Sequence, residues 1–213
     1  MTATLDAILT AAPVIAVVTF DDPQRAVDAT HALQAGGIRA IEVTLRTPNA
    51  LACVRAIHDA IPDALVGIGT ALRIEDIERG ADAGARFAVS PGLTPTLLTQ
   101  SKPIAWLPGI ATASELMMGL EAGLSRFKLF PAQAVGGLAL LDGLAAPFPQ
   151  ARFCPTGGVT QDNAAAYLAR GNVVCVGGSW LAPPDLVAAG DWAEITRRAA
   201  AAATLHPRSD KSA

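Results

Sequence analysis

Short apolar runs rich in β-branched residues alternate with Ala-rich segments along almost the whole chain. Of all the features of the sequence, this alternation most limits the folds that the chain can adopt. The pattern recurs about eight times, about 17 to 26 residues apart, which is the size of a βα unit. The strand-like runs are residues 14–20, 39–45, 64–69, 86–90, 103–107, 126–130, 152–154 and 172–176. Helix-favouring segments between them include residues 23–35, 48–61, 114–122 and 161–169.

Eight parallel strands with intervening helices predict an α/β fold, here a compact single-domain (β/α)8 TIM barrel. We expect the barrel to span residues 1–205 of the 213, with a short leading helix over residues 3–11 and a frayed tail over residues 206–213. The alternative is an open doubly wound sheet. The number of runs and the lack of a Gly-x-Gly-x-x-Gly turn after the first run both disfavour it.

The composition excludes several classes of protein. Hydrophobic residues make up 51% of the chain and charged residues 16%, so most of the chain can fold around a sizeable core. The 16 basic and 19 acidic residues give a net charge of -3 without a Lys/Arg run, so we expect no nucleic-acid partner. Residues 1–6 carry an acid where a secretory signal carries basic residues, and Pro, Gly and Glu interrupt the later apolar stretches. We expect a cytoplasmic protein without a membrane partner.

Neither the cysteines nor the histidines have the spacing of a metal site. Cys53, Cys154 and Cys175 lie at irregular intervals inside apolar stretches, which is typical of small core residues. The three histidines fall on helix-favouring segments or in the tail and share no ligand spacing with other residues. We therefore expect no bound metal.

Lys128 is the only one of three lysines inside an apolar strand-like run. Strand alternation places it with Arg126 and Phe130 on one face and places Phe127 and Leu129 on the other, so we expect it to point into the barrel. Burial favours the neutral amine, which is the form that attacks a ketone to give a Schiff base. The alternative is a structural lysine that either snorkels to the surface or is held in a salt bridge.

Glu42 is the only one of six glutamates inside a strand-like run. Its strand and that of Lys128 are both even-numbered, so the two side chains can share a layer of the barrel and face each other. A carboxylate beside an amine suits imine chemistry, which needs one acid/base to move protons on and off several intermediates. The alternative is a buried ion pair of Glu42 with Arg46 or Arg126.

Paired glycines follow the last two strand-like runs, at positions 157 and 158 and at positions 177 and 178. Such glycines expose backbone N–H groups. Helix starts expected at Thr160 and after Ser179 add the positive end of a helix dipole, and barrels commonly hold phosphate at this place. The pattern predicts a phosphorylated small molecule as ligand, although each pair alone also fits a tight turn.

Two further polar residues follow the second and third runs. Arg46 has the fork geometry that holds a carboxylate, and Thr70 can donate to the same group. The alternatives are a surface salt bridge for Arg46 and a helix cap for Thr70.

Six short segments together resemble the class I 2-keto-3-deoxy-6-phosphogluconate (KDPG) aldolases, which also act on 4-hydroxy-2-oxoglutarate (KHG). The resemblance covers nearly the whole chain, and its segments are residues 41–48 (IEVTLRTP), 67–70 (GIGT), 89–92 (VSPG), 127–132 (FKLFPA), 155–158 (PTGG) and 176–179 (VGGS). It implies a homotrimer of (β/α)8 barrels that reversibly splits KDPG into pyruvate and glyceraldehyde 3-phosphate without metal or cofactor. A branch that acts on the galactonate epimer is less similar, because it lacks the Leu-Arg-Thr-Pro signature after its glutamate.

The resemblance also implies a role for each matching residue. Lys128 forms the imine with the keto carbon, and Glu42 moves protons, partly through water. Arg46 and Thr70 hold the pyruvyl carboxylate.

The remaining matches surround the rest of the substrate. Pro91 and Phe130 form apolar walls, and Thr156 contacts the hydroxyl region. The residues implied as a phosphate cradle are Gly157, Gly158, Gly178 and Ser179.

Two other classes of function stay open. One is a different barrel enzyme on a phosphorylated substrate, such as an isomerase or decarboxylase, in which Lys128 acts only through its charge. The other is a silent barrel that binds a phosphosugar as a sensor or serves as a trimeric scaffold. The second is disfavoured because a silent protein has no reason to keep Glu42 and Lys128 inside its core.

Overall fold

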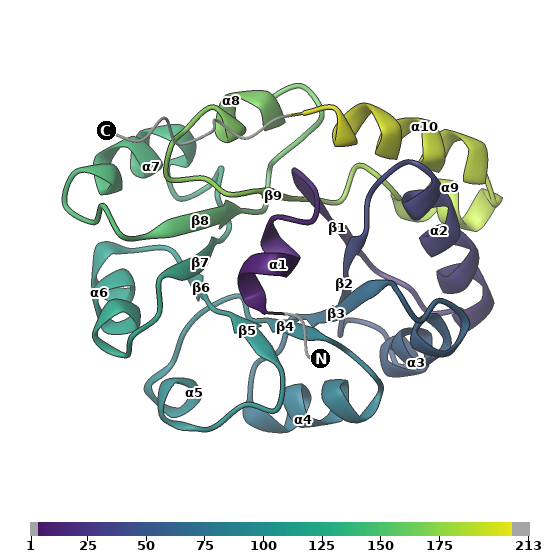
Figure 1. Ribbon diagram of the computed structural model, residues 1–213, viewed down its shortest axis with the longest axis horizontal. Helices are drawn as coiled ribbons and strands as arrows, with labels where there is room; N and C mark the ends of the chain where they lie inside the picture. The colour runs from purple at the N-terminus through teal and green to yellow at the C-terminus, as the bar shows by residue number, and fades with distance from the viewer. Residues whose placement is uncertain (1–3, 206–213) are drawn as a thin grey trace.

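A computed structural model describes residues 4–205 and shows parallel strands surrounded by helices (Figure 1). The strands are β1 (Val14–Val18), β2 (Ala40–Thr44), β3 (Leu65–Gly69), β4 (Phe87–Val89), β5 (Ala105–Leu107), β6 (Gly109–Ile110), β7 (Arg126–Leu129), β8 (Arg152–Pro155) and β9 (Val176–Gly178). The helices are α1 (Leu5–Leu9), α2 (Pro23–Ala35), α3 (Ala50–Ala60), α4 (Ile74–Asp82), α5 (Pro95–Thr99), α6 (Ala113–Glu121), α7 (Gly137–Ala145), α8 (Ala164–Leu168), α9 (Pro184–Ala189) and α10 (Trp192–Ala203).

Hydrogen bonding divides the strands into two sheets. One has six strands in the order β5-β4-β3-β2-β1-β9, and the other has three in the order β6-β7-β8. Every pairing is parallel, which confirms the α/β class. Only isolated bridges, Phe153 with Val173 and Thr156 with Gly177, join β8 to the segment that contains β9. The structure thus shows a curled six-stranded parallel sheet and a second sheet of three strands, rather than the single eight-stranded sheet expected from the sequence.

A proline explains the break between β5 and β6. Pro108 separates the two strands, and a proline has no N–H with which to continue a ladder. Its carbonyl still accepts a hydrogen bond from Lys128 N at 2.8 Å. The fifth expected strand, residues 103–107, is therefore β5 alone, and β6 is an additional short strand that pairs with β7 instead of β4.

Other boundaries also differ from the expected ones. The eighth expected strand, residues 172–176, is instead β9 at Val176–Gly178, because its first residues reach β8 only through the bridge at Val173. The leading helix is Leu5–Leu9 rather than residues 3–11. The tail expected at residues 206–213 lies outside the described residues.

Strand alternation sorts the apolar side chains into two cores. Residues such as Val14, Ala16 and Val18 of β1 belong to an outer core beneath the helices. Ile15 of the same strand belongs to a smaller inner core that also contains Phe87 and the cysteines of β8 and the approach to β9. The outer core stabilises the fold, and the inner core fills the space enclosed by the strands.

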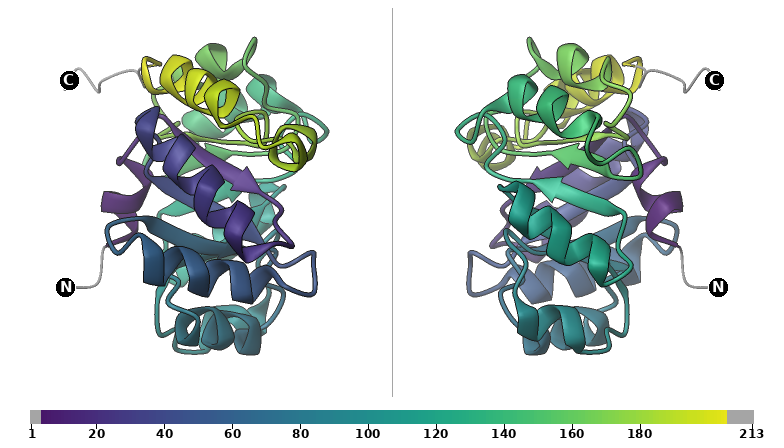
Figure 2. Two further views of the ribbon diagram at one scale, coloured as in Figure 1. Left: turned by 90° about the vertical axis from the view of Figure 1, so that its right-hand side faces the viewer. Right: turned by 90° about the vertical axis from the view of Figure 1, so that its left-hand side faces the viewer.

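Helix α1 covers the amino ends of the strands. Ile8 and Leu9 are buried in the inner core, and Asp6 forms an ion pair of 2.7 Å with Arg126 at the start of β7. Figure 2 shows α1 at one end of the strands, apart from the layer that contains α2, α3 and α10. Functional groups at the carboxyl ends therefore lie at the opposite opening. Within residues 4–205, no helix has the length and apolar character needed to cross a membrane.

Candidate active site

Glu42 and Lys128 meet inside the protein. They come from β2 and β7, which lie on opposite sides of the enclosed space in Figure 1. Lys128 Nζ donates to both carboxylate oxygens of Glu42, at 3.0 and 3.3 Å. The side chains are buried, since Glu42 is 3% and Lys128 5% exposed. The structure thus joins the two ionisable groups that the sequence places inside strands.

Small neighbours leave room for this pair. A Cβ built at Gly69 would lie 2.2 Å from Glu42 Oε1, so the carboxylate occupies space that a side chain at position 69 would fill. The Lys128 ammonium lies 5.2 Å from the centre of the Phe130 ring. An apolar wall on one side and a glycine on the other hold the pair in one geometry.

Two cysteines lie below the pair in the inner core. Cys154 is the register partner of Lys128 on β8, and Cys175 precedes β9. A hydrogen bond with Cys154 and burial raise the pKa of the Cys175 thiol well above its usual value. Both cysteines are buried in the inner core, in keeping with the expectation that they are core residues.

Arg46 and Thr70 lie together at the carboxyl ends of β2 and β3. Arg46 Nε donates to Thr70 Oγ1 at 3.2 Å. Thr70 has a φ of 60°, and no other residue except glycine has a positive φ among residues 4–205. For a β-branched residue this conformation is strained, and such strain gathers at functional sites. The pair can present a guanidinium and a hydroxyl to one carboxylate.

Pro91 is held in place by hydrogen bonds from its neighbours. Trp106 Nε1 donates to Ser90 Oγ at 3.0 Å, and Ser90 Oγ donates to the Gly92 carbonyl at 2.6 Å. A Cβ at Gly109 would lie 2.2 Å from the Pro91 carbonyl oxygen, so this loop packs directly on β6. The wall residue expected at position 91 is thus part of a fixed loop.

The glycine pair after β8 and the glycine pair that ends β9 lie next to each other. The bridge between Thr156 and Gly177 joins the ends of the two strands. Gly157 and Gly158 have φ values of 93° and 79°, which favour glycine. A Cβ at Gly178 would lie 2.0 Å from the Trp180 ring. Gly158 is exposed and Gly178 is buried within β9, so the loop after β8 carries the accessible backbone at the place where the sequence predicts a phosphate cradle with Ser179.

The helix starts expected beside this cradle are wrong. Helix α8 begins at Ala164 rather than Thr160, and α9 begins at Pro184, several residues after Ser179. A turn occupies the interval before α8, in which Thr160 N donates to Asn163 Oδ1 at 2.8 Å. Backbone N–H groups of loops, rather than helix dipoles, are the donors available here.

Sequence reasoning missed a pair of hydroxyl groups at the same opening. Thr19 follows β1 and is exposed, whereas Thr44 ends β2 and is 1% exposed. Their Oγ1 atoms are 2.8 Å apart. Thr44 lies two residues after Glu42 in β2 and therefore on the same face, but a threonine in a strand is too common to single out.

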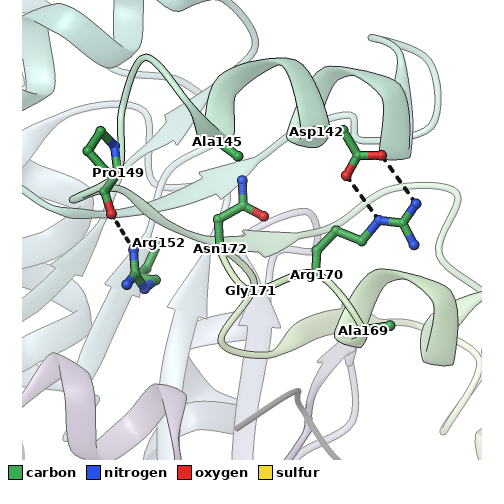
Figure 3. Close-up of a pocket in the computed structure, with 8 residues that line it drawn as sticks. All are labelled: Asp142, Ala145, Pro149, Arg152, Ala169, Arg170, Gly171 and Asn172. Carbon is green, nitrogen blue, oxygen red and sulfur yellow. Dashed lines mark hydrogen bonds and ion pairs between the residues drawn. The ribbon is translucent and has the colours of Figure 1, made fainter. Parts of the chain in front are cut away.

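A separate pocket of about 660 Å³ lies at the amino end of β8 (Figure 3). Its Arg170 is bound to Asp142 at 3.1 and 3.2 Å, and Arg152 donates to the carbonyl groups of Pro149 and Ala151. These guanidinium groups hold loops and helix ends together. The pocket lies away from Glu42 and Lys128 and contains none of the residues expected in the site.

No three or more His, Cys, Asp or Glu side chains among residues 4–205 are grouped so that they could hold a metal ion. What the site offers is an amine, a carboxylate, a guanidinium and exposed backbone N–H groups. Such a set can bind an anionic ketone, form an imine with it and transfer its protons.

Comparison with known proteins gives the same chemistry. Residues 5–198 match the family of KDPG and KHG aldolases. A KHG/KDPG aldolase of Escherichia coli strain K12 is 48% identical over 196 residues, which cover 91% of this chain and 92% of the relative. A 2-dehydro-3-deoxy-phosphogluconate aldolase of Dickeya dadantii is 48% identical over 202 residues, 92% of this chain and 95% of the relative.

The fold has a similar solved counterpart. A crystal structure of KDPG aldolase from Legionella pneumophila has a TM-score of 0.93 and 41% identity, and the match covers 96% of this chain and 100% of that one. In that structure pyruvate is captured at low pH as a covalent carbinolamine intermediate.

Proposed function

Because the chain belongs to the KDPG and KHG aldolase family, we propose that it is a class I aldolase that reversibly cleaves KDPG to pyruvate and glyceraldehyde 3-phosphate. The observation that carries this proposal is the buried contact of 3.0 Å between Lys128 Nζ and Glu42 Oε1. A lysine among apolar walls with one carboxylate in reach has what imine formation requires.

Lys128 is the nucleophile of the reaction. Its amine adds to the ketone carbon of KDPG to give a carbinolamine, which loses water to form an imine. A proton must leave the ammonium before attack, and Glu42 Oε1 is the base within 3.0 Å. The imine then accepts the electron pair of the bond between carbons three and four, so cleavage gives an enamine instead of a free carbanion.

Glu42 is the acid/base of the later steps. As the carbon–carbon bond breaks, Glu42 accepts the proton of the C4 hydroxyl, whose carbon becomes the aldehyde of glyceraldehyde 3-phosphate. Glu42 next protonates the enamine at carbon three. Water then releases pyruvate from Lys128.

The other residues hold the two ends of the substrate. Arg46 and Thr70 bind the carboxylate, with Arg46 Nε free to exchange its bond to Thr70 Oγ1 for one to the substrate. Pro91 and Phe130 keep water from the imine. The phosphate binds the loop N–H groups of the cradle residues, Gly157, Gly158, Gly178 and Ser179, and thereby positions the bond that breaks.

Borohydride trapping tests the nucleophile. The protein is incubated with pyruvate and borohydride, and peptide mass mapping is expected to find one reduced three-carbon adduct at Lys128. Lys128→Arg is the matched variant, because it keeps a cation beside Glu42 and cannot form the imine. An unmodified wild-type protein, or an adduct at another residue, would overturn the role of Lys128.

The same site accommodates a second substrate. We propose that the chain also cleaves KHG to pyruvate and glyoxylate, because KHG has the same ketone and carboxylate and the family includes KHG aldolases. The galactonate epimer of KDPG is the alternative phosphorylated substrate. A coupled assay of pyruvate release from all three substrates ranks them.

We further propose that the two sheets work as one (β/α)8 barrel formed by a single domain. β5 and β6 continue each other across Pro108, and the bridge between Thr156 and Gly177 joins β8 to β9, which together would close the ring. A crystal structure in which these strands form no continuous ring would contradict this proposal.

Family membership also supports a homotrimer in the cytoplasm. Light scattering of the purified protein is expected to give three times the chain mass of 21.8 kDa. Cell fractionation tests the location. A monomer in solution, or activity outside the cytoplasmic fraction, would contradict these two proposals.

A further inference from the structure

We propose that Thr19, oriented by Thr44, is a specificity-determining residue that binds the hydroxylated chain of the substrate beyond carbon four. This inference rests on the proposed aldolase function and deepens it. Its starting observation is the contact of 2.8 Å between Thr19 Oγ1 and Thr44 Oγ1 at the opening of the site.

The register of the strands places Thr19 above the reacting groups. Val17 of β1 is opposite Glu42 of β2, so Thr19 lies two residues farther toward the carboxyl ends, a rise of about 7 Å. Alternation directs Val17 and Thr19 to the same inner face. The hydroxyl of Thr19 therefore lies over the site rather than beneath the helices.

The Thr19 hydroxyl can donate a hydrogen bond to a ligand. Thr44 is 1% exposed, and within residues 4–205 the only hydrogen-bond partner of its Oγ1 is Thr19 Oγ1. Either hydroxyl could be the donor by geometry, but a buried O–H without an acceptor costs free energy, so we infer that Thr44 donates to Thr19. Thr19 then accepts from Thr44 and directs its own O–H toward the exposed side.

The backbone around Thr19 is firmly held. Thr47 Oγ1 donates to the carbonyl of Phe20, the next residue along the chain. Asn49 binds Asp21 twice, through its backbone N at 3.2 Å to Oδ1 and through Nδ2 at 3.1 Å to the carbonyl. Thr19 is therefore fixed to the turn that carries Arg46, and its hydroxyl is preorganised for binding.

The path of the substrate passes this hydroxyl. With the ketone at Lys128 on β7 and the phosphate at the ends of β8 and β9, carbons four to six must run toward β9. β1 is the other neighbour of β9, since Ala16 is opposite Gly178. Thr156 and Thr19 thus stand on the two sides of β9.

Gly177 of β9 presents no side chain to the enclosed space. A Cβ there would lie 2.2 Å from Thr156 Oγ1, so only glycine fits beside this threonine. Thr19 lies three residues beyond Ala16, the register partner of Gly178, and is therefore nearer the opening than Gly177. The hydroxyls of Thr156 and Thr19 thus lie at two depths along the way out of the site, which fits a polyhydroxylated chain whose oxygens can accept from Thr19 and donate to it.

Two substrates separate this contact from the chemistry. KDPG carries a hydroxyl on carbon five and a phosphate, whereas KHG ends in a carboxylate at carbon five. The readout is the ratio of kcat/KM for KDPG to kcat/KM for KHG. Thr19→Val keeps the shape of the side chain and removes the hydroxyl, so we expect this ratio to fall about tenfold.

Three further variants complete the test. Thr19→Ser keeps the hydroxyl, and its ratio is expected within about twofold of wild type. Thr44→Val removes only the orienting partner and is expected to lower the ratio about threefold. Thr204→Val, at an exposed threonine after α10, is the control for a threonine-to-valine change and is expected to match wild type.

The outcomes separate this proposal from the proposed function. An unchanged ratio in Thr19→Val, equal losses on both substrates, or an equal loss in Thr19→Ser would overturn the role of Thr19 while the wild type remains an aldolase. Wild-type protein that cleaves neither KDPG nor KHG would overturn the proposed function itself.

Discussion

Gly69 controls where the Glu42 carboxylate lies, because a Cβ at position 69 would come within 2.2 Å of Oε1. We expect Gly69→Ala to move Glu42 away from Lys128 and to lower kcat by about 100-fold, in the range that a general acid/base contributes. Circular dichroism is expected to show an intact fold.

Gly143→Ala in α7 is the matched control, since a Cβ there meets nothing within 4 Å. It is expected to retain wild-type kcat. Gly69→Ala with wild-type kcat would show that Glu42 has room to move without consequence.

Thr70 offers a second test at the scale of one residue. Its φ of 60° costs a β-branched residue about 1–2 kcal/mol, and glycine avoids this cost but loses about 0.5–1 kcal/mol of chain entropy. Thr70→Gly is therefore expected to raise the free energy of unfolding by about 0.5–1 kcal/mol and to raise KM. Urea denaturation and steady-state kinetics measure the two effects. A less stable variant would mean that the conformation is not strained.

The positions of single functional residues were predictable where an ionisable side chain interrupts an apolar strand. Lys128 and Glu42 are ionisable groups inside apolar strands, so alternation alone was enough to face them toward each other. Thr19 and Thr44 do not stand out in the sequence, because threonine is common in strands. Only the distance between their hydroxyl oxygens in the structure shows their contact. The left-handed backbone of Thr70 also leaves no mark in the sequence.

At the scale of elements, α3 carries a group that makes stability depend on pH. Burial first, and then the charges of Asp21 and Asp22, raise the pKa of the Cys53 thiol from 9.0 to about 11. Between these pH values the unfolded chain loses the thiol proton and the native protein keeps it, so stability falls as pH rises.

We expect the free energy of unfolding to decrease by at most about 3 kcal/mol from pH 9 to pH 11 through this group. Cys53→Ala is expected to lose that part of the decrease. Denaturant titrations at several pH values measure it. A pH dependence equal in both proteins would exclude Cys53 as its source.

Whether a segment forms a helix or a strand was predictable, but its first and last residues were less so. The helix over residues 23–35 has the expected bounds because Asp22 caps it and Pro23 begins it. The apolar character of residues 172–176 predicted a strand there. Apolar residues indicate burial and not hydrogen bonding, however, and in the structure the strand begins at Val176. Similarly, β5 and β6 are separate strands because Pro108 has no N–H to donate, which a pattern of hydrophobic residues does not indicate.

At the scale of the molecule, the inner core depends on α1 as well as on the strands. Ile8 is fully buried there, so Ile8→Ala is expected to lower the free energy of unfolding by about 2–5 kcal/mol. If α1 is part of one cooperative domain, far-UV circular dichroism and tryptophan fluorescence will follow the same shifted transition. Two separate transitions would show that α1 docks on a core that folds without it.

Because α1 packs on the inner core at the amino ends of the strands, the substrate and products of the proposed reaction use the opening at the carboxyl ends. Pyruvate stays tethered at the far end of this passage until water reaches it, so the aldehyde has to depart first. An aldehyde that returns meets the waiting enamine and is condensed again. Net cleavage therefore depends on how fast the enamine is protonated and its imine hydrolysed, and accumulated aldehyde should return the enzyme to the imine of the intact substrate.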